Sequence, residues 1–469
     1  MKNSHKIIVF IFSLLPNAIA PLQSSVAAEL KVNSKPNFVI ILADDLGYGD
    51  LGCFGHPTIR TPNLDRMAAE GQKWTSFYSA APVCTPSRAG LMTGRLPIRT
   101  GMTSDRNHVL FPESKGGLPE NEITIASALK TSGYSTACIG KWHLGNLPQY
   151  TANAHGFDYF FGMTCGNDEY LQEGRDYKTS LIDPKVEYFN VPLMRNTEIL
   201  ERPADQTTYT RKCTEEAINF IKQNKDKPFF LYLAHTAPHV PLFRSTKFEN
   251  KSLRGIYGDV VEELDWSVGE ILATLKKNGL DNNTLVVFTS DNGPWTGFQE
   301  LGGSAGLLSG GKGNGGTFEG GMREPTIFRW PGKLKTGVVM DMATGMDLFP
   351  TISKLAGVPL PNDRIYDGYD ISPVMFGTGK DPRDVVYYYR DAQLFAIRRG
   401  EFKVHFKILP ENGHDSFTSK DLPLLFNLNI DPSEKQNIAA KHPEIIKEII
   451  EIQKQHQATL VPVENQLEK

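Results

Sequence analysis

Four short apolar segments, spread along the chain, constrain its fold more than any other feature. Each is continuously apolar and ends at polar residues, as expected for a strand that is buried on both faces. Helical patterns lie between them, for example at 207–224 and 257–278. Strands that alternate with helices predict an α/β fold with a mostly parallel sheet. The four segments are 37–43, 134–140, 229–235 and 284–290.

Charged, amide and imidazole side chains follow each of these segments at the point where the predicted strand ends. In a parallel sheet, ligands bind at the carboxyl edge of the strands. We therefore expect a functional site at that edge, assembled from four separate parts of the chain. The polar residues concerned are Asp44 and Asp45, Lys141 to His143, His235 to His239, and Asp291 with Asn292.

The segment 84–95 reads Cys-Thr-Pro-Ser-Arg-Ala-Gly-Leu-Met-Thr-Gly-Arg. A cysteine followed by x-Pro-Ser-Arg and closed by Thr-Gly-Arg resembles the signature of the formylglycine-dependent sulfatases. In that family the cysteine is oxidised to an aldehyde before the protein folds, and the hydrated aldehyde is the nucleophile. The resemblance implies this role for Cys84. The alternative is an unmodified, buried cysteine at the start of a helix.

Further blocks at 310–313, 318–325 and 425–437 carry the same resemblance, to sulfatases of the arylsulfatase and N-acetylgalactosamine-6-sulfatase type. It implies an alkaline-phosphatase-like α/β sandwich with a large mixed, mostly parallel sheet. It also implies a smaller C-terminal α+β domain with an antiparallel sheet. We expect a catalytic domain at 29–370 and this subdomain at 371–469. Its expected strands and helix are 385–389, 395–399, 402–406, 423–430 and 442–457.

Asp44 and Asp45 are adjacent carboxylates, which repel each other unless a cation lies between them. Gly47 and Gly49 would let the backbone curl so that both carboxylates point inward. An all-oxygen ligand set suits a hard divalent cation, calcium before magnesium. Taken alone, each acidic pair could equally be a turn or a helix cap. The ligands that the resemblance implies are Asp44, Asp45, Asp291, Asn292 and an oxygen of the matured Cys84.

The resemblance also implies roles for five basic side chains. Arg88 would steady the aldehyde hydrate, and Lys141 would contact both the sulfate and the hydrate. His143 would take a proton from the hydrate; in an extended segment it faces the same side as Lys141. His239 would contact the sulfate and protonate the leaving alcohol, with Lys312 beside it at the bridging oxygen. Alone, any of them could be an ordinary surface or core residue.

One position departs from the family pattern. After the Gly-Phe-Asp at 156–158, related arylsulfatases carry a serine that contacts the sulfate, and Gly166 stands near that place here. Asn167 or Asp168 could replace the serine, or the contact could be missing. The substrate of those relatives therefore does not transfer directly to this chain.

The N-terminus has the pattern of a secretory signal peptide over residues 1–28, with basic Lys2 and Lys6 before an apolar stretch too short to span a bilayer. An exported protein is expected, periplasmic or secreted, or lysosomal in a eukaryote. The formal net charge of −3 argues against a nucleic-acid partner. Five cysteines in 469 residues are too few for a fold that depends on disulfides.

The sequence thus favours a sulfatase that hydrolyses sulfate esters, most readily of a carbohydrate, using a single divalent cation. Its required partner is a formylglycine-generating or anaerobic sulfatase-maturating enzyme. One alternative is a phosphodiester or phosphonate hydrolase of the same superfamily. Another is a non-catalytic binder of sulfated glycans, which would result if Cys84 is not oxidised. A zinc site at His235 and His239 is disfavoured because Pro238 lies between them.

Overall fold

The computed structural model describes residues 1, 35–313, 316–409 and 417–469. Apart from Met1, the expected signal peptide lies outside the described residues. Residues 35–469 pack as one unit. None of the helices described there is long and apolar enough to cross a membrane. The five cysteines are free.

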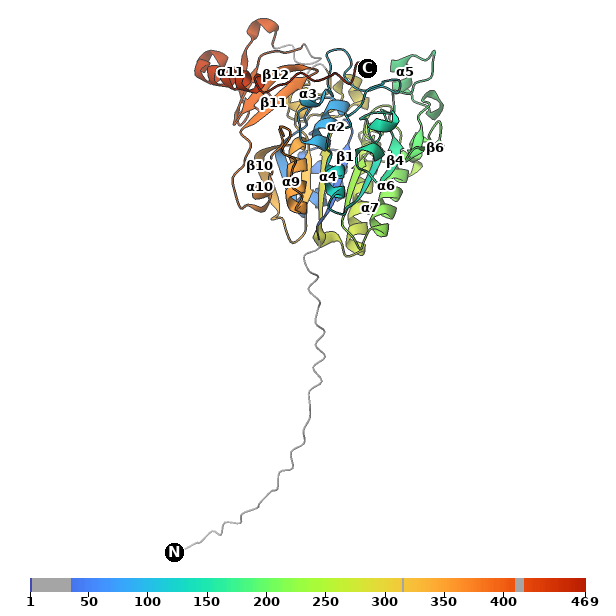
Figure 1. Cartoon of the computed structure of the whole chain (residues 1–469). Helices are drawn as coiled ribbons and strands as arrows, with labels where there is room; N and C mark the ends of the chain where they lie inside the picture. Colours follow the sequence, from blue (N-terminus) through green and yellow to red (C-terminus); the bar gives the residue numbers. More distant parts are fainter. Residues whose placement is uncertain (2–34, 314–315, 410–416) are drawn as a thin grey trace. The chain divides into compact units, whose positions relative to one another are not determined.

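A ten-stranded mixed sheet forms the centre of this unit (Figure 1). Its middle, from β8 through β1, β7 and β3 to β4, is parallel throughout, as expected. Antiparallel β9 lies between β8 and β2. In spatial order the strands are β10 (Gly337–Thr344), β2 (Gln72–Tyr78), β9 (Thr326–Arg329), β8 (Thr284–Ser290), β1 (Asn37–Ala43), β7 (Phe229–Ala234), β3 (Ser135–Lys141), β4 (Tyr159–Met163), β5 (Leu193–Arg195) and β6 (Glu198–Glu201).

The central strands are buried on both faces because alternate side chains enter two different hydrophobic clusters. On β1, Phe38 and Ile40 pack with residues of α2, α4 and α9. Val39 and Ile41 pack on the other face with residues of α1, α6 and α7. The helices are α1 (Pro62–Ala69), α2 (Cys84–Thr93), α3 (Pro97–Thr100), α4 (Ile125–Lys130), α5 (Tyr177–Ile182), α6 (Tyr209–Gln223), α7 (Ile256–Lys277), α8 (Glu319–Met322), α9 (Leu348–Ala356), α10 (Ser372–Phe376) and α11 (Pro443–Gln457).

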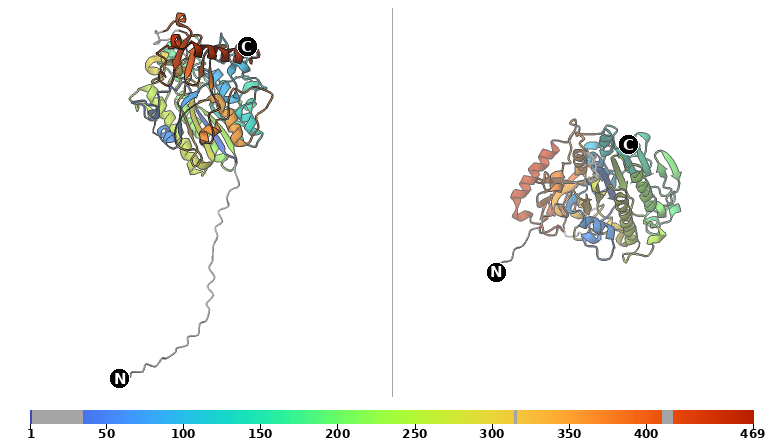
Figure 2. Two further views of the ribbon diagram at one scale, coloured as in Figure 1. Left: turned by 90° about the vertical axis from the view of Figure 1, so that its left-hand side faces the viewer. Right: turned by 90° about the horizontal axis from the view of Figure 1, so that it is seen from below.

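A separate four-stranded antiparallel sheet follows near the C-terminus, and α11 packs against it (Figures 1 and 2). Its strands are β11 (Val385–Arg390), β12 (Gln393–Arg399), β13 (Phe402–His405) and β14 (Leu424–Asn427), in that order. Both the large mixed sheet and this smaller antiparallel sheet match the expected fold class.

Buried polar contacts join the small sheet to the large one. The Glu319 carboxylate accepts hydrogen bonds from Tyr78 of β2 and Tyr388 of β11, both at 2.7 Å. Lys403 of β13 donates to the same carboxylate at 3.0 Å and lies 2.9 Å from Glu434. Glu319 is the first residue of α8, so the start of this helix is held from both sheets.

Candidate active site

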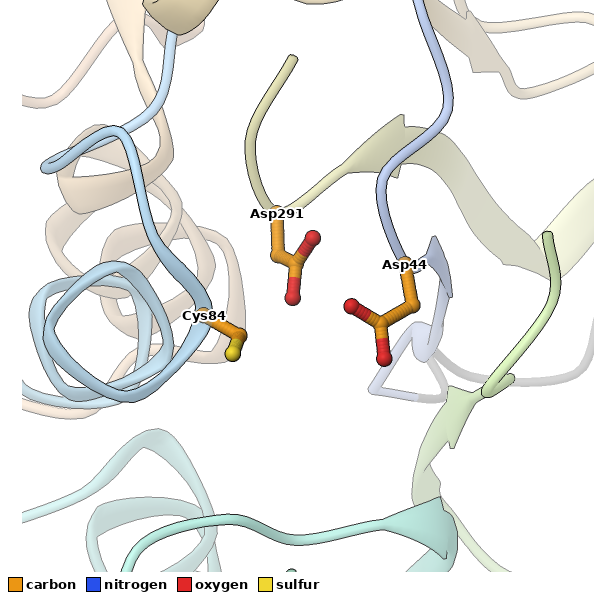
Figure 3. A group of neighbouring side chains, drawn as sticks. All are labelled: Asp44, Cys84 and Asp291. Atoms are coloured by element: carbon orange, nitrogen blue, oxygen red, sulfur yellow. The ribbon is translucent and has the colours of Figure 1, made fainter. Parts of the chain in front are cut away.

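The register of β1 and β8 places Asp44 and Asp291 side by side. Ala43 pairs with Ser290 at the ends of the two strands, and the Asp291 N–H donates to the Ala43 carbonyl at 3.1 Å. Cys84, the first residue of α2, faces them from a third segment (Figure 3). One ligand atom from each of Asp44, Cys84 and Asp291 lies within 4.8 Å of the others, and all three residues are buried.

Asp45 reaches the same site because its own backbone is left-handed, with φ 63°. The expected curl therefore occurs at Asp45 and not at the glycines. Gly47 and Gly49 instead allow close packing, since a Cβ would lie 2.2 Å from the Ser304 carbonyl oxygen at Gly47 and 2.6 Å from the Gly306 backbone at Gly49.

The oxygen-rich cluster fits a hard divalent cation. The Asn292 amide donates to Asp45 at 2.7 Å, which brings the fourth expected ligand residue into the group. Oδ1 of Asp44 and Oδ1 of Asn292 are buried and accept no hydrogen bond within the described part of the chain. Buried acceptors without donors are costly unless a cation or another donor satisfies them. Burial and the charge of Asp44 raise the pKa of Asp291 to about 6, as expected for crowded carboxylates without a cation.

Three cationic side chains surround the carboxylates. Arg88, one turn after Cys84 on α2, donates to Asp291 at 2.9 Å and to the Lys141 carbonyl at 2.7 Å. Lys141, the last residue of β3, lies 2.6 Å from Asp44. Although burial alone would raise the pKa of the Asp44 carboxyl, Lys141 and the other nearby cations hold it well below its usual range.

Lys312 comes from the glycine-rich segment before α8. Its Nζ donates to both oxygens of Asp45, at 2.9 and 3.0 Å. The same ammonium lies 4.8 Å from the ring centroid of Trp295. The sequence grouped Lys312 with His239, and both line the same cavity.

His143 lies beyond the end of β3 in a left-handed conformation, with φ 58°, so it is not part of an extended segment with Lys141. Its Nε2 lies 2.9 Å from the Leu110 carbonyl and 3.2 Å from Oε1 of Glu169. Because both neighbours are acceptors, Nε2 carries a proton and Nδ1 is left as the proton acceptor. Burial alone would lower the pKa of His143, but the negative charge of Glu169 raises it above its usual range.

His239 is buried near Asp45, with Nε2 3.5 Å from Oδ2 of Asp45. Its Nδ1 is hydrogen-bonded to the carbonyl of Val240. Burial lowers the pKa of His239 to about 4, and the nearby charge of Lys312 acts in the same direction. The imidazole is therefore neutral at pH 7 until an anion enters beside it.

His235, in contrast, points away from this cluster. It bonds through Nε2 to Ser267 of α7 at 3.1 Å, so it is a buried structural residue. Arg95 pairs with Glu122 and is also separate from the site. Neither side chain belongs to the candidate site.

A cavity of about 360 Å³ opens onto Cys84, His239 and Lys312. Two loop segments, 108–111 and 168–177, supply much of its wall. Sequence reasoning missed Glu169, because no motif or periodicity singles it out. The Asn167 amide is hydrogen-bonded to Gln206, whereas Asp168 lines the cavity. The remaining lining residues are Val83, His108, Val109, Phe111, Glu169, Leu171, Tyr177, Trp295 and Gly313.

Known protein families match nearly the whole described chain. The sulfatase family model covers residues 36–358, and the model for the C-terminal region of aryl-sulfatase covers 381–469. The chain is 40% identical to arylsulfatase A of Homo sapiens, over 92% of this chain and 89% of that protein. It is 38% identical to N-acetylgalactosamine-6-sulfatase of Canis lupus familiaris, over 92% and 88%.

Among solved structures, Ps i-CgsB in complex with k-i-k-neocarrahexaose superposes with a TM-score of 0.78 and 31% identity, covering 92% of this chain and 95% of that one. Identity at this level over nearly the whole length, together with both family models, establishes more than a shared fold. The chain belongs to the sulfatase family and is a sulfuric ester hydrolase.

Proposed function

We propose that this sulfatase acts through a formylglycine made from Cys84 and that its substrate is a sulfated carbohydrate. The observation that carries the proposal is the convergence of Cys84 with two buried carboxylates and three cations at one cavity. Oxidation of the thiol to the aldehyde requires a separate maturation enzyme, either formylglycine-generating or anaerobic sulfatase-maturating. We also propose that the chain is exported after removal of residues 1–28.

In the proposed reaction, one hydroxyl of the hydrated aldehyde at residue 84 gives its proton to the neighbouring Asp291 carboxylate and attacks the ester sulfur. The bond from sulfur to the substrate oxygen breaks, and His239 protonates the departing alcohol. His143 then removes the proton of the second hydroxyl through Nδ1, the ring nitrogen that makes no hydrogen bond among the described residues. Sulfate leaves as the aldehyde re-forms, so no water needs to attack a crowded ester.

His239 must carry a proton to act as the acid toward the leaving alcohol, and the bound substrate favours this protonated form. A sulfate ester brings negative charge next to the imidazole and therefore raises its pKa from about 4 toward the range of a useful acid. Arg88, Lys141 and Lys312 would neutralise the charge on the transferring group. Because they already lie on carboxylates, their side chains are held in place before the substrate arrives.

Asp44, Asp45, Asp291 and Asn292 would hold the divalent cation, calcium before magnesium, together with an oxygen of the matured residue 84. When bound, such a cation supplies Lewis-acid stabilisation of negative charge on sulfate oxygens. The two acceptor atoms without donors, on Asp44 and Asn292, support this assignment.

A carbohydrate substrate is supported by the cavity and by the relatives. Trp295 lines the cavity and is held edge-on by Phe298, with ring centroids 4.8 Å apart, so its face is a fixed surface for a sugar ring. One solved relative was crystallised with a neocarrahexaose, and another relative is named for a sulfated amino sugar.

The gap between the two family models, at 359–380, supports a catalytic domain at 29–370 and a subdomain at 371–469.

The test is sulfate release from a panel of sulfated sugars by protein made together with a formylglycine-generating enzyme. Peptide mass first establishes that residue 84 is oxidised. We expect release from at least one regioisomer, and none from Cys84→Ala, which should keep the wild-type fold. Activity retained in Cys84→Ala would overturn the mechanism. No release by oxidised protein would favour a phosphodiester or phosphonate substrate.

A further inference from the structure

One carboxylate in the cavity has no role in the reaction described above. Asp168 is 94% buried, since its exposed fraction is 6%, and it lines the cavity together with Trp295 and Phe111. Its Oδ2 accepts a hydrogen bond from the Tyr177 hydroxyl at 2.6 Å, which fixes the orientation of the carboxylate. The cavity wall around it is otherwise largely apolar or aromatic.

The second oxygen, Oδ1, is available to a ligand. It lies 4.0 Å from Nδ1 of His239, too far for a hydrogen bond, and that nitrogen is already bonded to the Val240 carbonyl. In the described part of the chain no donor is hydrogen-bonded to Oδ1. Asp168 lines the cavity, so a bound group that donates to Oδ1 would form a charge-assisted hydrogen bond with it.

The sulfate itself cannot be this donor, because two anions in a buried cavity repel each other. Asp168 therefore does not replace the sulfate-contacting serine that relatives carry near Gly166. The alcohol part of the substrate is different: its ester oxygen would meet His239, and the carbons next to that oxygen can carry hydroxyl groups. Such a hydroxyl is the kind of donor that Oδ1 of Asp168 lacks.

Resting on the sulfatase function proposed above, we propose that Asp168 determines specificity by accepting a hydrogen bond from a free hydroxyl next to the sulfate ester. The preferred substrate is then a neutral sugar unit that is monosulfated, with the neighbouring hydroxyl unsubstituted. A second sulfate or a carboxylate at that neighbour would place an anion against the Asp168 carboxylate. Aromatic sulfates, which lack the hydroxyl, would not make this hydrogen bond.

The experiment compares three sugar substrates: a hexose monosulfate that the wild type hydrolyses, its analogue with hydrogen in place of the neighbouring hydroxyl, and the vicinal disulfate. Nitrophenyl sulfate is the fourth substrate. Each is assayed with wild type, D168A, D168N and Y177F, all with residue 84 shown to be oxidised and with melting temperatures recorded. The measured quantity is the ratio of kcat/KM between substrates within each variant, so a general loss of activity cancels.

We expect D168A to reduce the preference for the hydroxyl-bearing sugar over its deoxy analogue by roughly 30-fold or more, since a site built to bind a hydroxyl discriminates strongly. D168N removes the charge but keeps an acceptor oxygen. D168N should therefore lose less of that preference. It should also raise kcat/KM for the disulfate, relative to kcat/KM for the monosulfate, by about 10-fold. Y177F should lie between wild type and D168A, because it frees the carboxylate to rotate.

An equal loss on all substrates in D168A, with the ratios unchanged, would overturn the proposal and would indicate that Asp168 only orients His239. Hydrolysis of nitrophenyl sulfate but of no sugar would also overturn it, while leaving the sulfatase chemistry intact. If oxidised wild-type protein releases sulfate from none of the four substrates, the proposed function fails and this inference fails with it.

Discussion

Oε1 of Glu169 lies 3.2 Å from Nε2 of His143, inside a site where both residues are at least nine-tenths buried. This carboxylate fixes the imidazole through Nε2 and leaves Nδ1 without a hydrogen bond among the described residues, and its charge raises the pKa of His143. A base held in this way has the proton affinity to deprotonate a hydroxyl at residue 84, but it accepts that proton only when it is itself unprotonated.

Replacing Glu169 with Gln should therefore lower the maximal kcat by about 10- to 100-fold, as is common when a partner that orients a functional histidine is removed. Without the negative charge the pKa of His143 falls, so the rising limb of the kcat–pH profile should move to lower pH. E169D, which keeps the charge, should leave the limb closer to its wild-type position. An unchanged limb in E169Q would contradict the pairing.

Removal of divalent cations should abolish most of the activity and lower the melting temperature. The reason is that Asp44, Asp45 and Asp291 then repel one another inside a buried cluster. A ligand held at 100 times its Kd contributes about 2.7 kcal/mol to stability. Calorimetry after chelation, and again after adding calcium, measures this shift. A chelated protein with unchanged activity and melting temperature would rule out the cation site.

The parts of this site that lie on strands could be predicted from the sequence. The segments 37–43 and 284–290 coincide with β1 and β8 because continuous apolar runs have few alternatives to a buried strand. Because Asp44 and Asp291 directly follow these two strands, parallel pairing of the strands is enough to bring the two carboxylates together.

The rest depends on contacts that leave no local pattern. Glu169 contacts His143 from one loop, and Val109 and Phe111 line the cavity from another. Loops have no regular spacing of hydrophobic residues, so the sequence pattern does not single out these residues. The left-handed backbone at Asp45 was also not predictable, because it follows from where Asp45 must point and not from its type. Strand β9 is short and antiparallel within an otherwise parallel region, which pairing rules do not anticipate.

Glu319 is expected to be the residue that most strongly fastens the small sheet to the large one. Glu319→Gln leaves buried Lys403 with Glu434 as its one remaining charged partner among the residues that the structure describes. Breaking a buried ion pair in this way costs about 3 kcal/mol or more in the free energy of unfolding. Tyr388→Phe removes a single hydrogen bond to the same carboxylate and should cost only about 1 kcal/mol. Urea unfolding measures both; equal costs would show that Glu319 acts only through its hydrogen bonds.

His235 should make the folded protein sensitive to acid. Burial lowers its pKa from 6.5 to about 4, so the unfolded state takes up a proton in the range between these values while the folded state does not. The unfolded state then binds more protons, and stability falls as the pH drops from 6.5 toward 4. For a shift of this size the loss of stability is about 2 kcal/mol between pH 7 and pH 5.

Unfolding in urea at pH 7, 6 and 5 should show that the stability advantage of wild type over His235→Gln shrinks by this amount. Ser267→Ala, which removes the hydrogen-bond partner of His235, should instead lower stability by a roughly constant amount at all three values. If the gap between wild type and His235→Gln stays constant from pH 7 to pH 5, His235 is not the group that makes the fold acid-sensitive.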